Sequence, residues 1–217
     1  MSATPSSQSL KRTERTRAAL MGAGRDLFSI HAFDAVAIDD IVGAAGVAKG
    51  TFYNHFEDKT ALLGAIVAAV RERIETLVSG VNADVEDPAA RLARAMCVYV
   101  VSVIDAPVDG QILLRNDPRR SASEPLNDGL RRDLAAGLDA GRLSMPTIEA
   151  GLVYVMGVAQ ALLVSVVRHT DRHEPVILAQ QLCTLMLRSF GIAHAEAETI
   201  ASQAADEIFR LRACDPD

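Results

Sequence analysis

The sequence predicts an all-α fold in which a small N-terminal domain of three helices precedes a larger helical domain. Hydrophobic residues make up 49% of the 217 positions and recur mainly at the three- and four-residue spacing of a helix. No Asn-Gly or Asp-Gly pair separates two alternating apolar runs, which is the pattern of a β-hairpin. A chain of this length can bury about 70–75% of its unfolded surface, enough for two helical domains.

The first four helices have clear boundary signals. Gly46 lies between two short apolar segments and can turn the chain at low steric cost. Asp58 is a good N-cap because its carboxylate can accept hydrogen bonds from the first backbone N–H groups of the next helix. Gly80 ends the apolar stripe that follows. The expected helices cover about residues 10–30, 38–44, 48–56 and 58–80.

Prolines mark most helix starts in the rest of the chain. At Asp87-Pro88 the acid is a good N-cap, and the proline takes the first helical position, where its missing N–H costs nothing. Residues 1–9 are polar and lack the apolar segment of a signal peptide, so we expect a disordered tail. The small domain is then 10–57 and the larger one 58–217. Further helices are expected at 88–105, 110–116, 125–140, 146–169, 175–191 and 196–211.

One apolar segment is long enough to raise the question of whether it spans a membrane. Residues 150–167 are uncharged for 18 positions, which reaches the lower limit for a membrane-spanning helix. Gln160 and Ser165 interrupt a segment already at that limit. A helix that is apolar all round is equally typical of a bundle core or a subunit interface. We adopt this second interpretation and expect no membrane association.

Cysteine usage and the absence of catalytic patterns narrow the class of protein. Cys97, Cys183 and Cys214 are odd in number and far apart, which fits neither a disulfide framework nor a zinc cluster and favours a reducing cytoplasm. His169 and His173 have the i, i+4 spacing of a metal pair, but no further ligand stands at a fixed spacing from them. We find no nucleophile with a local base, no phosphate-binding loop and no fixed pair of acids. We therefore expect a cytoplasmic protein that is not an enzyme and needs no metal or cofactor.

The charge of the whole chain hides a difference between its two parts. With 22 Lys+Arg and 28 Asp+Glu the net charge is −6, which by itself argues against a nucleic-acid partner. Residues 1–60 carry 7 basic and 7 acidic side chains, so residues 61–217 carry 15 and 21 and hold all of the excess acidity. The small domain is therefore free to bind an anionic partner through a few placed residues.

Residues 38–56, IDDIVGAAGVAKGTFYNHF, have the layout of a helix-turn-helix. Ala44 and Ala45 let the two helices approach, and Gly46 turns the chain. The second helix then presents a cation, hydroxyls, an amide and an imidazole, a set that suits the major groove of DNA. The alternative is a structural helical hairpin that contains a glycine.

At these residues the sequence closely resembles the TetR family of bacterial transcriptional regulators. The similarity covers Arg15 to Leu63. It comprises an amphipathic first helix that ends in Leu27-Phe28, followed by Ile38-Asp-Asp-Ile41, Ala45-Gly46-Val47, Lys49-Gly50-Thr51-Phe52-Tyr53, His55-Phe56 and Lys59.

The resemblance implies a set of DNA-binding residues on and beside the second of these helices. Lys49 and Thr51, at the front of this helix, would reach base edges or nearby phosphates, and Gly50 would let the backbone approach the DNA. The side chains that follow would form hydrogen bonds to phosphates or read a base. The alternatives are that Tyr53 and His55 chiefly cover the core of the small domain, and that Lys59 is a solvated charge at a helix end. The set is Lys49, Gly50, Thr51, Tyr53, Asn54, His55 and Lys59.

Two positions depart from the family pattern. Family members usually have Ser or Thr at the starts of the second and third helices, where this chain has Ala37 and Ala48. Losing such a cap typically costs about 1 kcal/mol, and the phosphate contact of the hydroxyl is lost as well. A basic segment is expected to compensate as a flexible arm that follows the DNA backbone. Its residues are Lys11, Arg12, Arg15 and Arg17.

The resemblance also implies a homodimer, because in TetR proteins two long helices form a four-helix bundle with their twins. Here these are 146–169 and 175–190, with Leu182, Leu185, Met186 and Phe190 available for the interface. A two-fold dimer would place two recognition helices about one turn of DNA apart on a near-palindromic double-stranded operator. The alternative is that these side chains belong only to the core of one protomer.

The remaining helix faces could enclose a small-molecule effector. The candidates would line a mostly aliphatic pocket with a hydroxyl or two and one amide, which suits a medium-sized, mostly apolar compound. Each candidate has plain core packing as its alternative. They are Met96, Tyr99, Val103, Ile112, Leu113, Leu134, Leu138, Tyr154, Met156 and Gln160.

The implied function is that of a ligand-responsive repressor that a small effector releases from DNA. Within the same family, an activator or a ligand-blind regulator stays open. Outside it, the alternatives are a helical ligand carrier without DNA binding, and a metal or redox sensor that uses Cys97. Arg115, Arg119 and Arg120 could meet an anionic ligand or simply be solvated.

Overall fold

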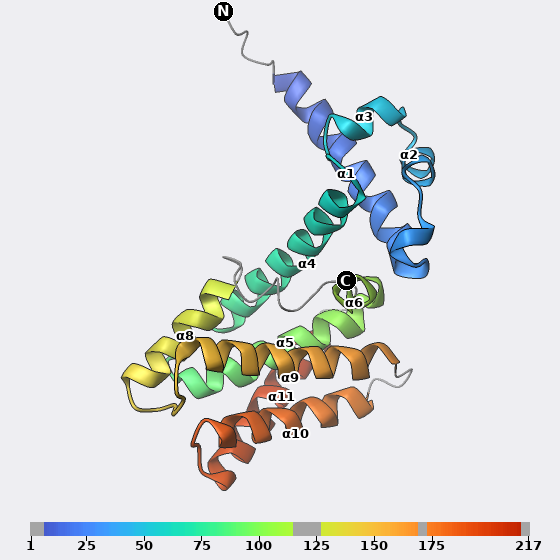
Figure 1. Ribbon diagram of the computed structural model, residues 1–217. Helices are drawn as coiled ribbons and strands as arrows, with labels where there is room; N and C mark the ends of the chain where they lie inside the picture. The colour runs from blue at the N-terminus through green and yellow to red at the C-terminus, as the bar shows by residue number, and fades with distance from the viewer. Residues whose placement is uncertain (1–6, 115–126, 169–172, 214–217) are drawn as a thin grey trace, which may run out of the picture.

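The computed structural model describes residues 7–114, 127–168 and 173–213, and within these ranges it contains helices and no strand. An all-α fold was predicted, and it is confirmed (Figure 1). The elements are α1 (Ser7–Ile30), η1 (Phe33–Ala35), α2 (Ile38–Ala45), α3 (Lys49–Tyr53), α4 (Lys59–Val81), α5 (Pro88–Asp105), α6 (Pro107–Leu114), α8 (Asp128–Asp139), α9 (Ile148–Arg168), α10 (His173–Ser189) and α11 (His194–Ala213).

The predicted helix caps are present. The Asp58 carboxylate accepts from the backbone N–H of Ala61 at 2.7 Å at the start of α4. Asp87 accepts from the backbone N–H of Ala89 at 3.1 Å at the start of α5, with proline in the first turn. Gly46 follows α2 in the left-handed conformation with φ +66°, which a residue with a side chain rarely adopts. These boundaries were predictable because each depends on only a few neighbouring residues.

Other boundaries differ from the prediction. Helix α1 already begins at Ser7, so residues 7–9 are helical, and residues 1–6 of the expected tail lie outside the described residues. Helix α3 is short and ends at Tyr53. Helix α6 begins at Pro107 because proline suits the first turn of a helix, and its axis is bent by 111° from that of α5.

The small domain packs α1, α2 and α3 around one aromatic and aliphatic core. Phe28, Ile41 and Phe52 are fully buried there, and Leu62 at the start of α4 joins them. Figure 1 shows α4 running from this domain down to the larger one. Because one continuous helix belongs to both domains, a movement of its lower half changes the position of its upper end.

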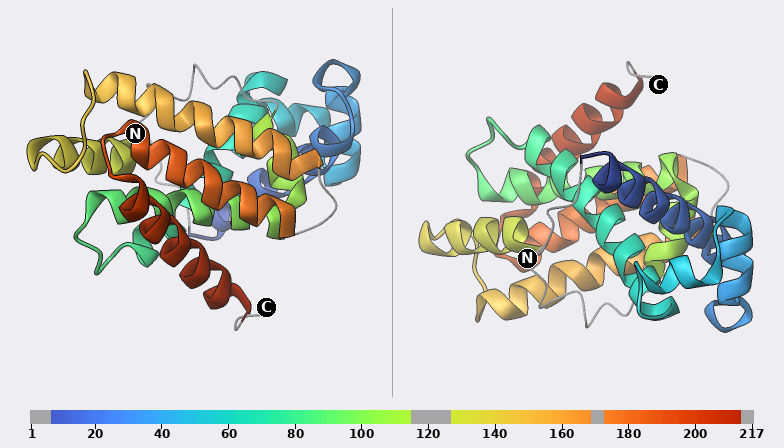
Figure 2. Two further views of the ribbon diagram at one scale, coloured as in Figure 1. Left: turned by 90° about the horizontal axis from the view of Figure 1, so that it is seen from below. Right: turned by 90° about the horizontal axis from the view of Figure 1, so that it is seen from above.

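The larger domain is built around α5, which contacts α4, α6, α8, α9, α10 and α11. Seen from below, α9 and α10 lie side by side in front of the rest of the domain (Figure 2). By length and composition α9 could cross a membrane, a criterion that a helix in the core of a soluble protein also meets. It packs against α5, α6, α8 and α10, yet only 33% of its most apolar window is buried.

Candidate functional site

Helices α2 and α3, here called the reading head, expose most of the residues that the sequence singled out. Lys49, Gly50, Tyr53 and Asn54 are exposed, while Thr51 and His55 are half-buried. The Tyr53 ring meets the buried Phe52 edge to face, with centroids 5.4 Å apart. The aromatic body of Tyr53 is thus fixed on the core, and its side chain remains accessible to a partner.

The cation at the front of α3 is already paired. The Lys49 ammonium lies 2.8 Å from one carboxylate oxygen of Asp39 on α2 and 3.0 Å from the other. The hydrogen bond to Asp39 raises the pKa of Lys49, so this lysine stays charged. Both side chains are exposed, and salt therefore weakens the pair readily. A phosphate that binds Lys49 has to compete with Asp39.

Lys59 does not point freely into solvent. Its ammonium donates to the backbone carbonyls of Phe33 at 2.7 Å and Val36 at 2.6 Å, and it lies 4.5 Å from the centroid of the Phe33 ring. These contacts fix η1 against the start of α4. They use two of the three donor hydrogens of the ammonium, which leaves one for a phosphate.

The two alanine caps have different surroundings. Ala37 cannot cap α2 with its side chain, but the Asp40 carboxylate accepts from the Ala37 backbone N–H at 2.9 Å and provides half of a capping box. Ala48 makes no side-chain cap for α3. The loss expected from the sequence is therefore partly offset at α2 and remains at α3.

The basic segment is not a flexible arm, and that expectation was wrong. Lys11, Arg12, Arg15 and Arg17 all lie within α1 and are exposed. The Arg17 guanidinium lies over the Phe56 ring at 5.2 Å from its centroid. All four residues fall within the helix predicted over residues 10–30, so the flexible arm, expected from other DNA-binding proteins, was at odds with that prediction. These cations are therefore held on a rigid helix beside the reading head.

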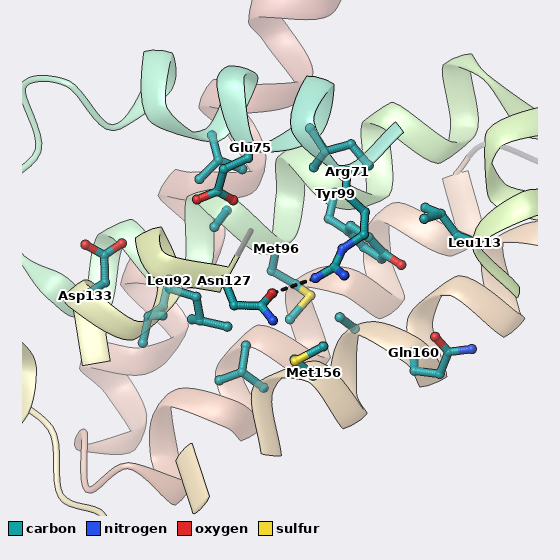
Figure 3. A pocket seen from close by; sticks show the side chains of 16 residues that line it. Arg71, Glu75, Leu92, Met96, Tyr99, Leu113, Asn127, Asp133, Met156 and Gln160 are labelled. Atoms are coloured by element: carbon teal, nitrogen blue, oxygen red, sulfur yellow. Dashed lines mark hydrogen bonds between the residues drawn. The ribbon is translucent and has the colours of Figure 1, made fainter. Parts of the chain in front are cut away.

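A cavity of about 180 Å³ lies in the larger domain between α4, α5, α6, α8 and α9. Five of the predicted residues line it: Met96, Tyr99, Leu113, Met156 and Gln160. Figure 3 shows Arg71 and Glu75 entering from α4, with Met156 and Gln160 on the opposite side. Among the described residues, the lining also includes Arg71, Ile74, Glu75, Val78, Leu92, Ala95, Asn127, Leu130, Asp133, Val155 and Ala159.

The other predicted lining residues lie elsewhere. Val103 packs against α6, where a Cβ on Gly110 would come within 2.6 Å of it. Leu134 is fully buried against Gly151 of α9. Tyr154 is 40% exposed and meets Phe190 edge to face at 5.6 Å between centroids. Ile112 and Leu138 are also absent from the lining. An apolar stripe on a helix does not by itself indicate which neighbour it faces.

The polar part of the cavity wall was not predicted from the sequence. Arg71 and Glu75 stand on the same face of α4 as Ile74 and Val78, at i, i+3, i+4 and i+7, a spacing that could have revealed them. Arg71 donates to the Asn127 side-chain oxygen at 2.7 Å. Burial, followed by the nearby Asp133 carboxylate, raises the pKa of Glu75.

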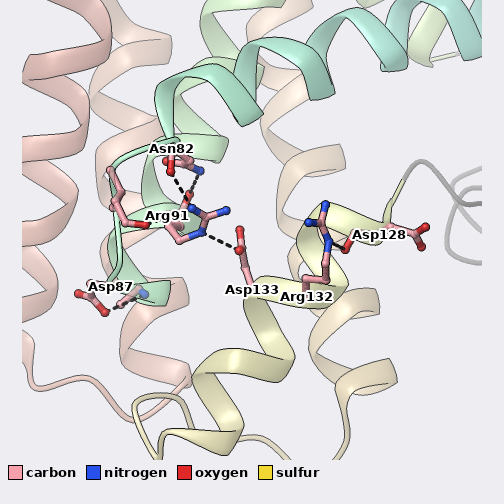
Figure 4. Close-up of polar contacts among 8 residues, drawn as sticks. Asn82, Asp87, Arg91, Asp128, Arg132 and Asp133 are labelled. Atoms are coloured by element: carbon pink, nitrogen blue, oxygen red, sulfur yellow. Dashed lines mark hydrogen bonds and ion pairs between the residues drawn. The ribbon is translucent and has the colours of Figure 1, made fainter.

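Asp133, from α8, is neutralised from outside the cavity. Its carboxylate pairs with Arg91 at 2.6 Å (Figure 4). Arg91 also donates to the backbone carbonyl of Asn82 at 2.7 Å, close to the end of α4. This network fixes one end of the cavity wall. Burial raises the pKa of Tyr99, so its hydroxyl remains protonated.

One buried carboxylate connects the two domains. Asp109 of α6 is 3% exposed and forms an ion pair with Arg25 of α1 at 2.7 Å through one oxygen. Its other oxygen pairs with Arg73 of α4. Helix α6 also provides Leu113 to the cavity wall. Asp109 thus adds a buried ion pair to the direct packing of α1 against α6 and α4, the two helices that carry part of the cavity wall.

Helices α9 and α10 carry four exposed apolar side chains, here called the outer face: Val153, Tyr154, Ile177 and Leu185. Their exposed fractions range from 40% for Tyr154 to 62% for Val153. Of the residues expected at an interface, Leu185 belongs to this face and Leu182 is half-buried. Met186 and Phe190 are buried in the core of the protomer, which corrects that part of the expectation.

The other residues that the sequence offered for an anionic ligand, a metal ion or redox chemistry are only partly within the described residues. Arg115, Arg119, Arg120, His169 and Cys214 lie outside the described residues, as does the side chain of His173. Among the side chains that are described, no group of three His, Cys, Asp or Glu could hold a metal ion. Cys97 and Cys183 are free and buried, as small apolar side chains of a core are.

Comparison with known families decides the classification. The model described as "Bacterial regulatory proteins, tetR family" matches residues 20–66, and "Tetracyclin repressor-like, C-terminal domain" matches residues 87–203. The second match alone covers more than half of the chain. The chain belongs to the TetR family. It is a TetR-family transcriptional regulator, and this family consists of DNA-binding regulators and not of enzymes.

Curated TetR-family relatives match parts of the chain. The HTH-type transcriptional repressor DhaR of Mycobacterium sp. (strain GP1) is 32% identical over 53% of this chain and 56% of its own length. The transposon Tn10 TetC protein of Escherichia coli is 46% identical over 23% of this chain and 25% of its own. The HTH-type transcriptional regulator UidR of E. coli K12 is 34% identical over 27% and 30%. The chain therefore matches about half or less of each of these relatives.

Solved TetR-family structures match almost all of the fold. RolR in complex with the ligand resorcinol has a TM-score of 0.69 and 27% identity, over 88% of this chain and 95% of that one. A TetR family regulator from Shewanella sp. PV-4 has a TM-score of 0.72 at 18% identity, over 80% and 97%. The second likeness supports the fold alone. The predicted architecture, a helix-turn-helix domain followed by a larger helical domain, is confirmed.

Proposed function

We propose that this TetR-family protein is a ligand-responsive repressor that binds a near-palindromic operator as a homodimer and leaves it when a small, mostly apolar effector fills the cavity. The observation that carries the proposal is that α4 both follows the reading head and lines the cavity. Four residues of α4 form part of the wall: Arg71, Ile74, Glu75 and Val78. The repressor-named relative DhaR supports the direction of regulation.

The reading head would bind DNA through its exposed side. Lys49 and Thr51 would meet base edges or phosphates, Tyr53 and His55 would bond phosphates, and Asn54 would read a base. Gly50 is exposed, and a Cβ built on it would contact nothing within the protein, so packing inside the protomer does not require a glycine here. We propose that the missing side chain lets the backbone approach DNA closely. Lys59 would add a phosphate contact through its remaining hydrogen.

The outer face supports a homodimer. Two copies that join these faces about a two-fold axis would bury apolar side chains that one protomer leaves in water. The same axis would place two reading heads about one turn of DNA apart, the geometry that a palindromic site requires. The partners that we propose are therefore double-stranded DNA, a second copy of the chain and an effector in the cavity.

The size of the cavity limits the effector. An engineered cavity of about 150 Å³ lined with aliphatic and aromatic side chains holds benzene. The cavity here is slightly larger, about 180 Å³, and most of its wall is apolar. An effector of about one ring fits these dimensions, and the complex of the similar protein RolR with resorcinol supports that size.

Release would follow from differential affinity. A ligand shifts an equilibrium between two spacings of the reading heads only as far as it binds one spacing better. Helix α4, which contacts the ligand at one end and carries the reading head at the other, is the element whose position would differ. Asp109 would add α1 and α6 to the same movement.

The direct test is a titration of the full-length protein against DNA from beside its own gene. We expect a saturable, sequence-dependent mobility shift that an unrelated duplex of equal length does not give. A matched variant, Tyr53→Ala and Asn54→Ala, should bind far more weakly and remain dimeric. The proposal fails if the protein gives no sequence-dependent shift, and a ligand carrier would then be the better description.

A second prediction concerns the basic residues of α1. Replacing Arg12 and Arg15 with alanine should lower operator affinity and flatten its dependence on salt, because each cation that neutralises a phosphate adds about 0.9 to the slope of log affinity against log salt concentration. Arg210→Ala, at an exposed position of α11, is the control and should leave the slope unchanged. Mobility shifts at four salt concentrations measure the effect. An unchanged slope in the double variant would show that these arginines do not contact DNA.

A further inference from the structure

We propose that the Glu75 carboxylate is the anchor of the cavity and accepts a hydrogen bond from the hydroxyl group of a small, neutral, single-ring ligand such as a phenol. The inference rests on the proposed function, in that it takes the cavity as the effector site. It goes further by naming the chemical group that the site selects and the atom that selects it.

Among the described residues, Glu75 is the charged residue of the wall for which no side-chain hydrogen bond or close ion pair is formed. Asp133 is paired with Arg91, and Arg71 donates to Asn127. Among the described residues, no hydrogen bond or ion pair reaches the Glu75 carboxylate at these bonding distances, although its side chain is half-buried and lines the cavity. A half-buried carboxylate that accepts no hydrogen bond is unfavourable, and a ligand that donates one would satisfy it.

The position of this carboxylate depends on the glycine opposite to it. A Cβ added to Gly129 of α8 would lie 2.1 Å from a Glu75 carboxylate oxygen, which is far inside van der Waals contact. The absence of a side chain at Gly129 is therefore what allows the carboxylate to lie against α8. Replacing this glycine by alanine would displace the acceptor without touching the rest of the wall.

The charges around Glu75 favour a neutral donor. A ligand carboxylate placed beside Glu75 would be repelled by the negative charge of that residue. An ammonium group would meet Arg71 and Arg132, whose positive charges act on Glu75. A hydroxyl group avoids both repulsions and donates to a desolvated carboxylate, where a charge-assisted hydrogen bond is strong.

The rest of the wall suits the ring. Leu92, Met96 and Met156 lie around the cavity (Figure 3), and Ala159 also lines it. Methionine sulfur makes favourable contacts with aromatic rings and adapts to irregular shapes. With a volume of about 180 Å³, the cavity accommodates one such ring, with its hydroxyl directed to α4.

The test is calorimetric titration of the full-length protein with four probes of similar size. These are phenol, resorcinol, anisole, in which a methoxy group removes the donor, and benzoate, which adds a negative charge. Wild-type protein should bind phenol and resorcinol at least about tenfold more tightly than anisole or benzoate, as expected for a hydrogen bond to a charged acceptor.

Two variants then locate the acceptor. Glu75→Gln and Gly129→Ala should each weaken phenol binding by about tenfold or more and leave anisole binding nearly unchanged. Glu72→Gln, at an exposed position one turn earlier on α4, is the matched control and should bind like wild type. Because burial disfavours the charged form of Glu75, Glu75→Gln should unfold at the same temperature as wild type or a higher one, which separates weaker binding from misfolding.

Three results would overturn the inference: no binding of any probe, equal affinity for phenol and anisole, or full phenol affinity in Glu75→Gln. None of them touches the proposed function, because sequence-dependent DNA binding is measured without a ligand. Conversely, if the protein binds phenol through Glu75 but gives no mobility shift with DNA, the inference about Glu75 holds and the proposal of a repressor is rejected.

Discussion

Val153→Glu and Leu185→Glu, made separately, should each convert the protein to a monomer and lower its affinity for the operator by about 100- to 10,000-fold. Both residues belong to the outer face, one on α9 and one on α10, and more than half of each side chain is exposed. In a two-fold dimer each protomer contributes the same residue to the interface. A single substitution to glutamate therefore buries two negative charges, one from each protomer.

The loss on DNA follows from the loss of linkage between the two reading heads. In a dimer, binding of one head holds the other at a high effective concentration over its own half-site. A monomer loses this gain although every DNA contact of its head is intact. The change should therefore appear in operator affinity and leave the fold of each protomer unaltered.

Sedimentation or light scattering gives the oligomeric state, and a mobility shift gives the affinity. Leu77→Glu, the same kind of change at an exposed position of α4, is the control and should remain dimeric. Circular dichroism should show the same helix content in all variants. If both outer-face variants sediment as dimers, the interface lies elsewhere on the molecule.

Asp109→Asn should lower the free energy of unfolding by about 2–3 kcal/mol and weaken the effect of effector on DNA binding. A hydrogen bond to a charged group typically contributes about 1.5–3 kcal/mol, and the change weakens two of them. The total is smaller than their sum because Arg25 and Arg73 are 39% and 50% exposed and regain water when released.

The functional part of this prediction has its own signature. The residue is not part of the cavity lining, so effector affinity should change little, whereas release from DNA by a saturating effector should decrease. Denaturant unfolding measures stability, and a cycle with Arg25→Ala measures the coupling between the two residues. Asp139→Asn, an exposed aspartate of α8, is the control. Normal release in Asp109→Asn would exclude this carboxylate from the transmission of the signal.

What the sequence could predict depended on how local the interaction is. The caps at Asp58 and Asp87 and the turn at Gly46 involve a few consecutive residues, and each was predicted correctly. The outline of the family fold was equally accessible, because its motif lies within residues 15–63.

The lining of the cavity depends on contacts between helices that are distant in the sequence. Apolar periodicity identified one helix face at a time, and it could not tell Leu134, which packs against α9, from Met96, which lines the cavity. The polar wall was missed because Arg71 and Glu75 look like solvated charges on α4 until α8 is placed opposite to them. The ion pair between Arg25 and Asp109 spans 84 positions and has no local signal at all.

The ion pair between Lys49 and Asp39 has a consequence for how quickly a regulator finds its site. A chromosome offers about a million or more competing sequences, and a protein held by each of them would search slowly. In the proposed complex with DNA, Lys49 would exchange Asp39 for a phosphate, and the carboxylate left behind would be repelled by the same backbone. This repulsion would shorten residence on non-operator DNA and leave time for the sequence that also satisfies the rest of α3.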